Sequence, residues 1–299
     1  MATSVELSHA TASASLAPKL TAVEAVVKFV RTKPLGAGGA VIILAMLFVA
    51  LVARALAPYD PYVGDYALQF ARPSAEHWFG TDEFGRDVFS RTIYAGRLSL
   101  LVGVSVVTFA AAFGVTLGLL AGFFRRLDAP VMRVVDAMMS FPDILLAIAL
   151  VGILGPSMLN VVLALVLVYT PRVARVVRAS TLVVRELLFV EAARAVGVST
   201  SRILWRHVLP NLMSPILVQA SFIFAYAILA EAALSFLGVG VPPEIPTWGT
   251  MVAGSQQYAH QALWIVLFPG LSIIVTALSL QLLGDGIRDL LDPRLRKSM

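Results

Sequence analysis

The sequence contains no cysteine, so it has no disulfides or thiolate chemistry and gives no indication of a redox compartment. Charged residues are also scarce, at 14% of the 299 residues, whereas soluble domains carry about a quarter. Lysine is absent between Lys33 and Lys297, which excludes a Gly-Lys-Ser/Thr phosphate loop there. The four histidines are scattered without metal-ligand spacing. We therefore expect a chain with no catalytic site, metal site or cofactor of its own.

Apolar residues make up 59% of the chain, and its mean hydropathy is +0.85. This composition indicates a membrane protein, because each spanning helix needs roughly 20 mainly apolar residues. Four segments meet that requirement clearly: 35–53, 98–124, 212–237 and 262–284. We therefore expect an all-α membrane protein.

The stretch 144–171 is uncharged, but Gly155-Pro156-Ser157 interrupts it with a turn signal and a helix-breaking proline. It predicts either one long crossing or a tight hairpin of two. The arginine-rich segments on both sides favour the hairpin, because such segments stay in the cytoplasm and an even number of crossings must separate them. The first span would begin within 130–141 and the second would cover 160–177.

The prediction is therefore six transmembrane helices with both termini in the cytoplasm. In chain order, we expect a cytoplasmic tail at 1–34 (first disordered, then a short amphipathic helix), the first transmembrane helix at 35–57, an external segment at 58–97, a core of five transmembrane helices at 98–285 that contains a cytoplasmic loop at 178–211, and a cytoplasmic tail at 286–299. The net charge of +5 is concentrated in the cytoplasmic segments, so it indicates membrane topology and not nucleic-acid binding.

The segment from Glu191 to Asn211 is the most chemically mixed stretch in the second half of the chain. Gly197 is expected to end a helix, because glycine adopts positive φ at little cost. Ser199 or Thr200 can then cap a second helix, and Pro210 is expected to end it. The spacing predicts two short helices joined at a glycine.

The second of these helices is predicted to be amphipathic. Arg202 and Arg206 lie one turn apart on a basic edge, while the neighbouring edges carry apolar residues. Such a helix can dock into a groove on another protein or rest on anionic lipid, and the residues alone favour neither.

The spacing of Glu191-Ala192-Ala193, Gly197 and Leu209-Pro210 resembles the signature loop, or EAA motif, of permease subunits of bacterial ATP-binding-cassette (ABC) importers. In that family this loop is the coupling helix that fits a cleft in the ATPase subunit. By this resemblance the coupling residues are Glu191, Ala192, Ala193, Gly197, Ser199, Arg202, Arg206, Leu209 and Pro210.

Other segments resemble a narrower group, the second (C-type) permeases of dipeptide, oligopeptide and nickel importers. They are His77-Trp78-Phe79-Gly80-Thr81-Asp82, Gly85-Arg86-Asp87, Ser90-Arg91, Pro246-Thr247-Trp248-Gly249, Gly284-Asp285-Gly286-Ile287-Arg288-Asp289 and Asp292-Pro293-Arg294. The resemblance covers roughly residues 27 to 297, with the motifs in the same order. His207 stands where the broad permease pattern often has isoleucine, as is normal in the peptide branch.

The resemblance implies a type I ABC importer-like permease core in the bacterial cytoplasmic (inner) membrane. It also implies a heterodimer with a homologous second permease, two ABC ATPase subunits that bind ATP and magnesium, and an external solute-binding protein. Dipeptides, oligopeptides, glutathione and nickel complexes all remain open as solutes, because in this family the binding protein mainly selects the solute.

Glu231 is the acid within an otherwise apolar predicted span, which makes it a candidate intramembrane polar site. The favoured interpretation is structural: it lies near the outer end and hydrogen-bonds a neighbouring helix or the partner permease. The alternative function, a stand-alone ion-coupled secondary transporter or channel, would require acidic or histidine residues in several spans.

Three other groups of residues invite interpretation. Gly114, Gly118 and Gly122 recur every four positions, which favours close helix packing. Asp82, Glu83, Arg86 and Asp87 form a charged patch, for which ion pairing in a turn is favoured over metal or peptide binding. Arg133 and Asp136 are expected to pair on a helix surface.

Overall fold

The computed structural model of the protein describes residues 22–291, so the predicted disordered start and the last part of the tail lie outside the described residues. The described part is helical and contains no named strand, only an isolated bridge between Thr81 and Asp87. Its α-helices are α1 (Ala22–Thr32), α2 (Pro34–Leu51), α3 (Ala53–Leu56), α4 (Val88–Phe123), α5 (Arg125–Met139), α6 (Asp143–Leu154), α7 (Met158–Val184), α8 (Leu188–Ala195), α9 (Thr200–Ile203), α10 (Met213–Phe236), α11 (Trp248–Ser255) and α12 (Trp264–Leu291).

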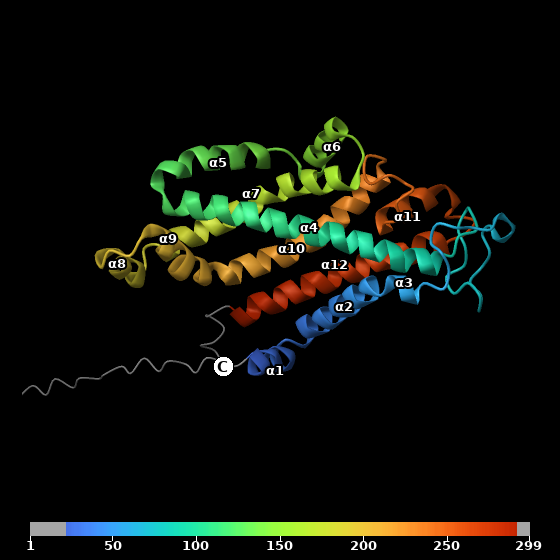
Figure 1. Cartoon of the computed structure of the whole chain (residues 1–299), viewed down its shortest axis with the longest axis horizontal. Coiled ribbons are helices and arrows are strands. Elements are labelled where there is room, and N and C mark those ends of the chain that lie inside the picture. Colours follow the sequence, from blue (N-terminus) through green and yellow to red (C-terminus); the bar gives the residue numbers. More distant parts are fainter. Residues whose placement is uncertain (1–21, 292–299) are drawn as a thin grey trace, which may run out of the picture.

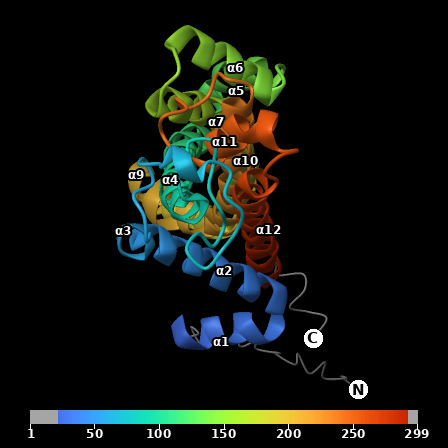
Figure 2. The same ribbon diagram turned by 90° about the vertical axis from the view of Figure 1, so that its right-hand side faces the viewer.

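The long helices α2, α4, α7, α10 and α12 run side by side along the long axis of the molecule (Figure 1). Five helices are long and apolar enough to cross a membrane, and the number is six if the bent pair α5–α6 is counted as one span. The predicted all-α membrane architecture is confirmed. Figure 2 shows α1 and α2 at one edge of the bundle and α5 and α6 at the opposite edge.

The third predicted span, expected to begin within 130–141, is a bent pair of helices. Helices α5 and α6 are inclined to each other by 91°, and the break falls at Ser140, Phe141 and Pro142. Proline has no N–H to continue the helical ladder and disfavours helical backbone in the residue before it, so the chain leaves the helix at Phe141. The turn predicted at Gly155 is present, with φ of +87°.

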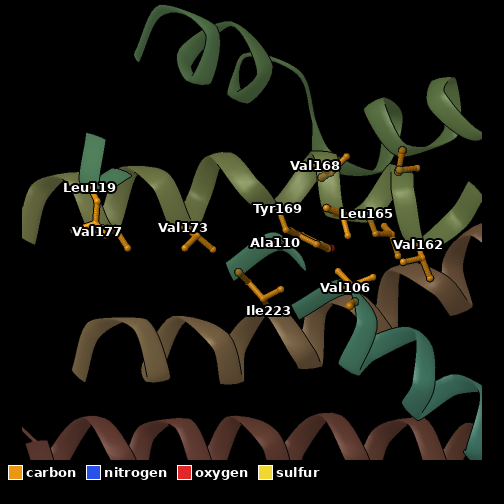
Figure 3. Packing of buried hydrophobic residues seen from close by; sticks show 14 of the residues in the cluster. Val106, Ala110, Leu119, Val162, Leu165, Val168, Tyr169, Val173, Val177 and Ile223 are labelled. Atoms are coloured by element: carbon orange, nitrogen blue, oxygen red, sulfur yellow. The ribbon is translucent and has the colours of Figure 1, made fainter. Parts of the chain in front are cut away.

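The glycines of α4 lie against α7, as their spacing predicts. A Cβ atom added to Gly118 would lie 2.6 Å from the carbonyl oxygen of Ala174, and one added to Gly122 would lie 2.6 Å from Cβ of Thr181. Figure 3 shows Val173 and Val177 of α7 in the buried cluster next to Leu119. Close packing of α4 on α7 therefore depends on the absence of side chains at these positions.

Three arginines lie within α7: Arg172 and Arg175 fall in the predicted span 160–177, whereas Arg178 is the first residue of the predicted loop 178–211. Arg172, Arg175 and Arg178 pair with Asp143, Asp136 and Asp128 of α5 and α6. The predicted pair between Arg133 and Asp136 is therefore wrong: Asp136 accepts from Arg175 at 2.6 Å. The carboxylates of α5 and α6 thus compensate the charges that α7 carries at these positions.

Helix α4 begins at Val88, within the range 58–97 predicted for the external segment. Asp87 caps this helix, accepting a hydrogen bond from the N–H of Ser90 at 2.7 Å. Figure 1 places residues 58–87 and α11 at one end of the bundle, and α8 with α9 at the other. The two predicted sides of the membrane therefore fall at opposite ends of the molecule.

Candidate functional site

The first half of the Glu191–Asn211 segment forms α8, which ends as predicted at Gly197. This glycine has φ of +78°, its N–H donates to the carbonyl of Arg194, and the next N–H, of Val198, donates to Ala193. These two hydrogen bonds form a Schellman motif, in which a residue with positive φ satisfies the last carbonyls of a helix. Gly197 itself is exposed, with no atom within 4 Å of the position of an added Cβ.

Helix α8 presents one face to the protein and the other to solvent. Val190 and Ala193 are buried in the apolar cluster that joins the ends of α4, α7 and α10. Glu191 and Ala192, on the other face, are exposed. Arg194 is held over the ring of Phe123 at the end of α4, with 4.9 Å from the guanidinium carbon to the ring centroid. The helix is thus anchored while Glu191 remains accessible.

The second half does not end at Pro210, and here the prediction is wrong. Helix α9 continues through a π turn (Leu204–Val208) and a 3-10 turn (Leu209–Leu212) into α10. In this wider turn the N–H of Leu209 donates to the carbonyl of Leu204, five residues earlier. The helical path therefore continues past Pro210, although proline has no N–H to donate. Ser199 is at the N-cap position, but its side chain makes no capping hydrogen bond.

The amphipathic pattern predicted for this half is confirmed. Ile203 and Val208 are buried in the core, whereas Arg202 and Arg206 are exposed. Sequence reasoning missed Trp205, whose side chain is 66% exposed between the two arginines. Large apolar residues that are exposed on a helix facing water are a sign of a docking surface. In the sequence, the sign of such a surface was the position of Trp205 on the basic edge of the helix.

Glu231 lies near the end of α10 that carries the external segment, and it is 1% exposed. Its Oε1 atom accepts hydrogen bonds from Ser235 at 3.0 Å and from Thr247 at 2.8 Å, while Oε2 has no hydrogen-bond partner. Thr247 also caps α11, and Gly249 allows this helix to approach the carboxylate. Glu231 therefore joins α10 to α11, in agreement with the structural interpretation.

The charged patch of the external segment is an ion-paired turn. Asp82 accepts from Nε of Arg86 at 2.7 Å and lies 3.4 Å from Nε of Arg91, and Asp87 contacts His77 at 2.9 Å. Burial raises the pKa of Glu83, which lines a cavity of about 290 Å³ beside this turn. Within residues 22–291, no group of three or more acidic or histidine residues is arranged to hold a metal ion.

Comparison with known proteins connects this arrangement to a family. Residues 114–297, more than half of the chain, match the family described as binding-protein-dependent transport system inner membrane component. The chain belongs to this family. It is a multi-pass protein of the bacterial inner membrane, as its apolar helices require.

Several family members resemble this permease along most of its length. It is 48% identical to a putative peptide transport system permease of Brucella suis, over 85% of this chain and 87% of that protein. It is 46% identical to the dipeptide permease DppC of Alkalihalophilus pseudofirmus, over 86% and 85%, and 41% identical to the glutathione permease GsiD of Pectobacterium atrosepticum, over 90% of each. These names cover more than one class of solute.

The fold also matches a solved permease. The methionine ABC transporter MetNI, in inward-facing conformations, aligns with a TM-score of 0.54 at 18% identity, over 65% of this chain and 94% of that chain. The match shows that the helices of this permease are arranged as in a type I ABC importer.

Replacing Glu231 tests whether this buried acid is structural or is needed in its ionised form. We expect Glu231→Gln to keep uptake within about twofold, because an amide oxygen can still accept from Ser235 and Thr247. Glu231→Ala leaves two buried hydroxyls without this acceptor, at about 1–3 kcal/mol for each unsatisfied group, and should reduce the amount of assembled complex. Transport assays and the yield of purified complex measure both effects.

Glu244→Ala is the matched control, since Glu244 is an exposed acid in the same external loop. Normal assembly without uptake in Glu231→Gln would show instead that the ionised carboxylate is required.

Proposed function

We propose that this permease is one of two membrane subunits of an ATP-driven importer for peptides or solutes of similar size. The names of the relatives in Brucella and Alkalihalophilus support the solute class. The observation that carries the proposal is the exposed α8–α9 segment, anchored at one end of the bundle and opposite the external segment.

The free energy for import must come from other chains in this proposal. No lysine lies between Lys33 and Lys297, so residues 34–296 hold no phosphate loop. We assign ATP and magnesium to two ATPase subunits, which would bind the Glu191–Asn211 segment and the equivalent segment of a homologous permease. An external solute-binding protein would deliver the solute to the opposite end of the heterodimer.

The continuity of α9 with α10 supplies the mechanical link. The helical path runs from Thr200 to Phe236 without a break, so a displacement of the segment at the ATPase is passed along a spanning helix. Val190 and Val208 pack in one buried cluster with residues of α4 and α7, so α8 and α9 move with those helices. Closure of the ATPases would thereby switch the path between its outward-open and inward-open states.

Reconstitution tests the proposed function. The four membrane and ATPase subunits, assembled in liposomes with the binding protein outside, should accumulate a labelled dipeptide only when ATP is present with the ATPases. Ionophores that dissipate proton and sodium gradients should leave uptake unchanged. Uptake by this chain alone, driven by an ion gradient, would contradict the proposal and favour a stand-alone secondary transporter.

A further inference from the structure

A cavity of about 460 Å³ lies between α7 and α10, close to the end of α5. Its lining includes Arg172, Arg175, Gln219, Phe222 and Tyr226. Gln219 and Tyr226 are separated in the sequence from both arginines, and the packing of α10 beside α7 brings the four side chains to one place. No acidic side chain lines this cavity.

The depth of these arginines determines what they can face. Arg172 lies near the middle of the spanning helix α7, yet its side chain is 35% exposed, and that of Arg175 is 49% exposed. A charged side chain that faces lipid at the centre of a bilayer costs about 2.5–3.5 kcal/mol or more, so such residues face water or protein. This side of α7 therefore does not face lipid.

Another side of α7 has an apolar surface instead of a charged one. A second cavity, of about 730 Å³, is formed between α4, α6 and α7 and includes Leu163 and Leu167 among a mainly apolar lining. Leu167 is 46% exposed. Helix α7 thus has one side suited to hydrocarbon and one side suited to water.

Both arginines are held in position, and most of their N–H donors remain available to another partner. Each guanidinium carries five N–H donors, and the structure gives each arginine one hydrogen bond, to Asp143 from Arg172 and to Asp136 from Arg175. Arg172 is further positioned over the ring of Tyr226, with 5.6 Å from its guanidinium carbon to the centroid. Guanidinium groups held in this way bind carboxylates through paired N–H donors.

We propose that this cavity is a carboxylate-binding site on the wall of the translocation path, where Arg172 and Arg175 bind the C-terminal carboxylate of the solute. Gln219 contributes an amide that can bind a peptide group, and Phe222 and Tyr226 contact apolar side chains. The assignment rests on the proposed import function for the identity of the solute, but its two physical claims, access to water and selectivity for anions, do not.

Single cysteines test these claims directly, because the chain has none of its own. In membrane vesicles that hold the full complex, Gln219→Cys is exposed to a sulfonatoethyl (anionic) or a trimethylammonioethyl (cationic) methanethiosulfonate reagent, and modification is measured on the isolated chain. We expect both reagents to label it, with the anionic reagent at least threefold faster after correction for their rates with a free thiol. Leu167→Cys should remain unlabelled.

Combining Gln219→Cys with Arg175→Gln should abolish the preference for the anionic reagent. Arg178→Gln is the matched control, since Arg178 forms the same kind of pair with Asp128 but does not line the cavity. A dipeptide should slow the labelling of Gln219→Cys more than its C-terminal amide does.

An unreactive Gln219→Cys, equal rates for the two reagents, or equal effects of Arg175→Gln and Arg178→Gln would each overturn the carboxylate site. These outcomes are read without any transport assay. Failure of ATP-driven dipeptide uptake in liposomes would instead count against the proposed function alone.

Discussion

Replacing Gly197 by aspartate is expected to reduce solute uptake by about tenfold or more, while the permease still inserts and assembles. The residue at this position must adopt φ of +78°, where a side chain costs roughly 1–2 kcal/mol, with aspartate at the lower end of that range. A cost of that size changes a local equilibrium by a factor of about 5 to 30. Because α8 has only eight residues, the distortion should displace Glu191 without unfolding the bundle.

Gly238→Asp is the control that separates coupling from backbone strain. Gly238 also has φ of +78°, its N–H and that of Val239 close α10 with the same two hydrogen bonds, and no atom lies within 4 Å of an added Cβ. It lies at the external end, so the same strain should leave ATP hydrolysis coupled to uptake. Measurements of ATPase activity and uptake in parallel distinguish the two variants.

Because the carboxylate of Glu191 is exposed, its replacement provides a second variant for the same experiment. Glu191→Ala removes no intramolecular contact that the structure shows, so normal insertion with ATP hydrolysis uncoupled from uptake would place the defect at the ATPase interface. Wild-type uptake in both Gly197→Asp and Glu191→Ala would show that this segment does not couple the subunits.

Gly118→Ala should strongly destabilise the permease, because its added methyl group meets backbone. The new Cβ would lie 2.6 Å from the carbonyl oxygen of Ala174 and 2.7 Å from Cβ of Val177, so α4 must move away from α7. Overpacking of this kind costs about 1–3 kcal/mol. We expect a lower melting temperature in detergent, followed by tryptophan fluorescence, and less complex in the membrane.

Gly152→Ala, inside α6, provides the comparison for that substitution. No atom lies within 4 Å of its added Cβ, and alanine favours helix over glycine by about 1 kcal/mol, so stability should be unchanged or higher. Equal melting temperatures for Gly118→Ala and the wild type would show that α4 and α7 do not require this close approach.

The prolines show that local sequence rules alone do not predict every helix end. Pro142 breaks the third crossing, but Pro210 lies within a continuous helical path, and Pro171 lies inside α7. All three residues lack an N–H, yet only the surrounding structure decides whether a wider turn or neighbouring groups accommodate the missing hydrogen bond. The end predicted at Pro210 was wrong for this reason.

The candidate sites show the same difference between features set by neighbouring residues and features set by tertiary contacts. The positive φ of Gly197 was predictable because a helix end involves only the residues beside it. Glu231 was recognised as unusual, but its partner Thr247 comes from the next external segment. Arg172 and Arg175 were counted only among the arginines that mark the cytoplasmic side, because the carboxylates that pair with them belong to other helices.

Neighbouring residues thus suffice for the number of apolar segments, the glycine turn of α8 and the absence of a phosphate loop from 34–296. The insertion of a segment into a bilayer and its local backbone conformation both depend on residues that are contiguous in the sequence. These features can therefore be predicted from the sequence alone. Which acid pairs with which arginine, and how Gln219 and Tyr226 meet Arg172, depend on distances between helices far apart in the sequence. Those distances are set by packing, such as the close approach of α4 to α7 at Gly118.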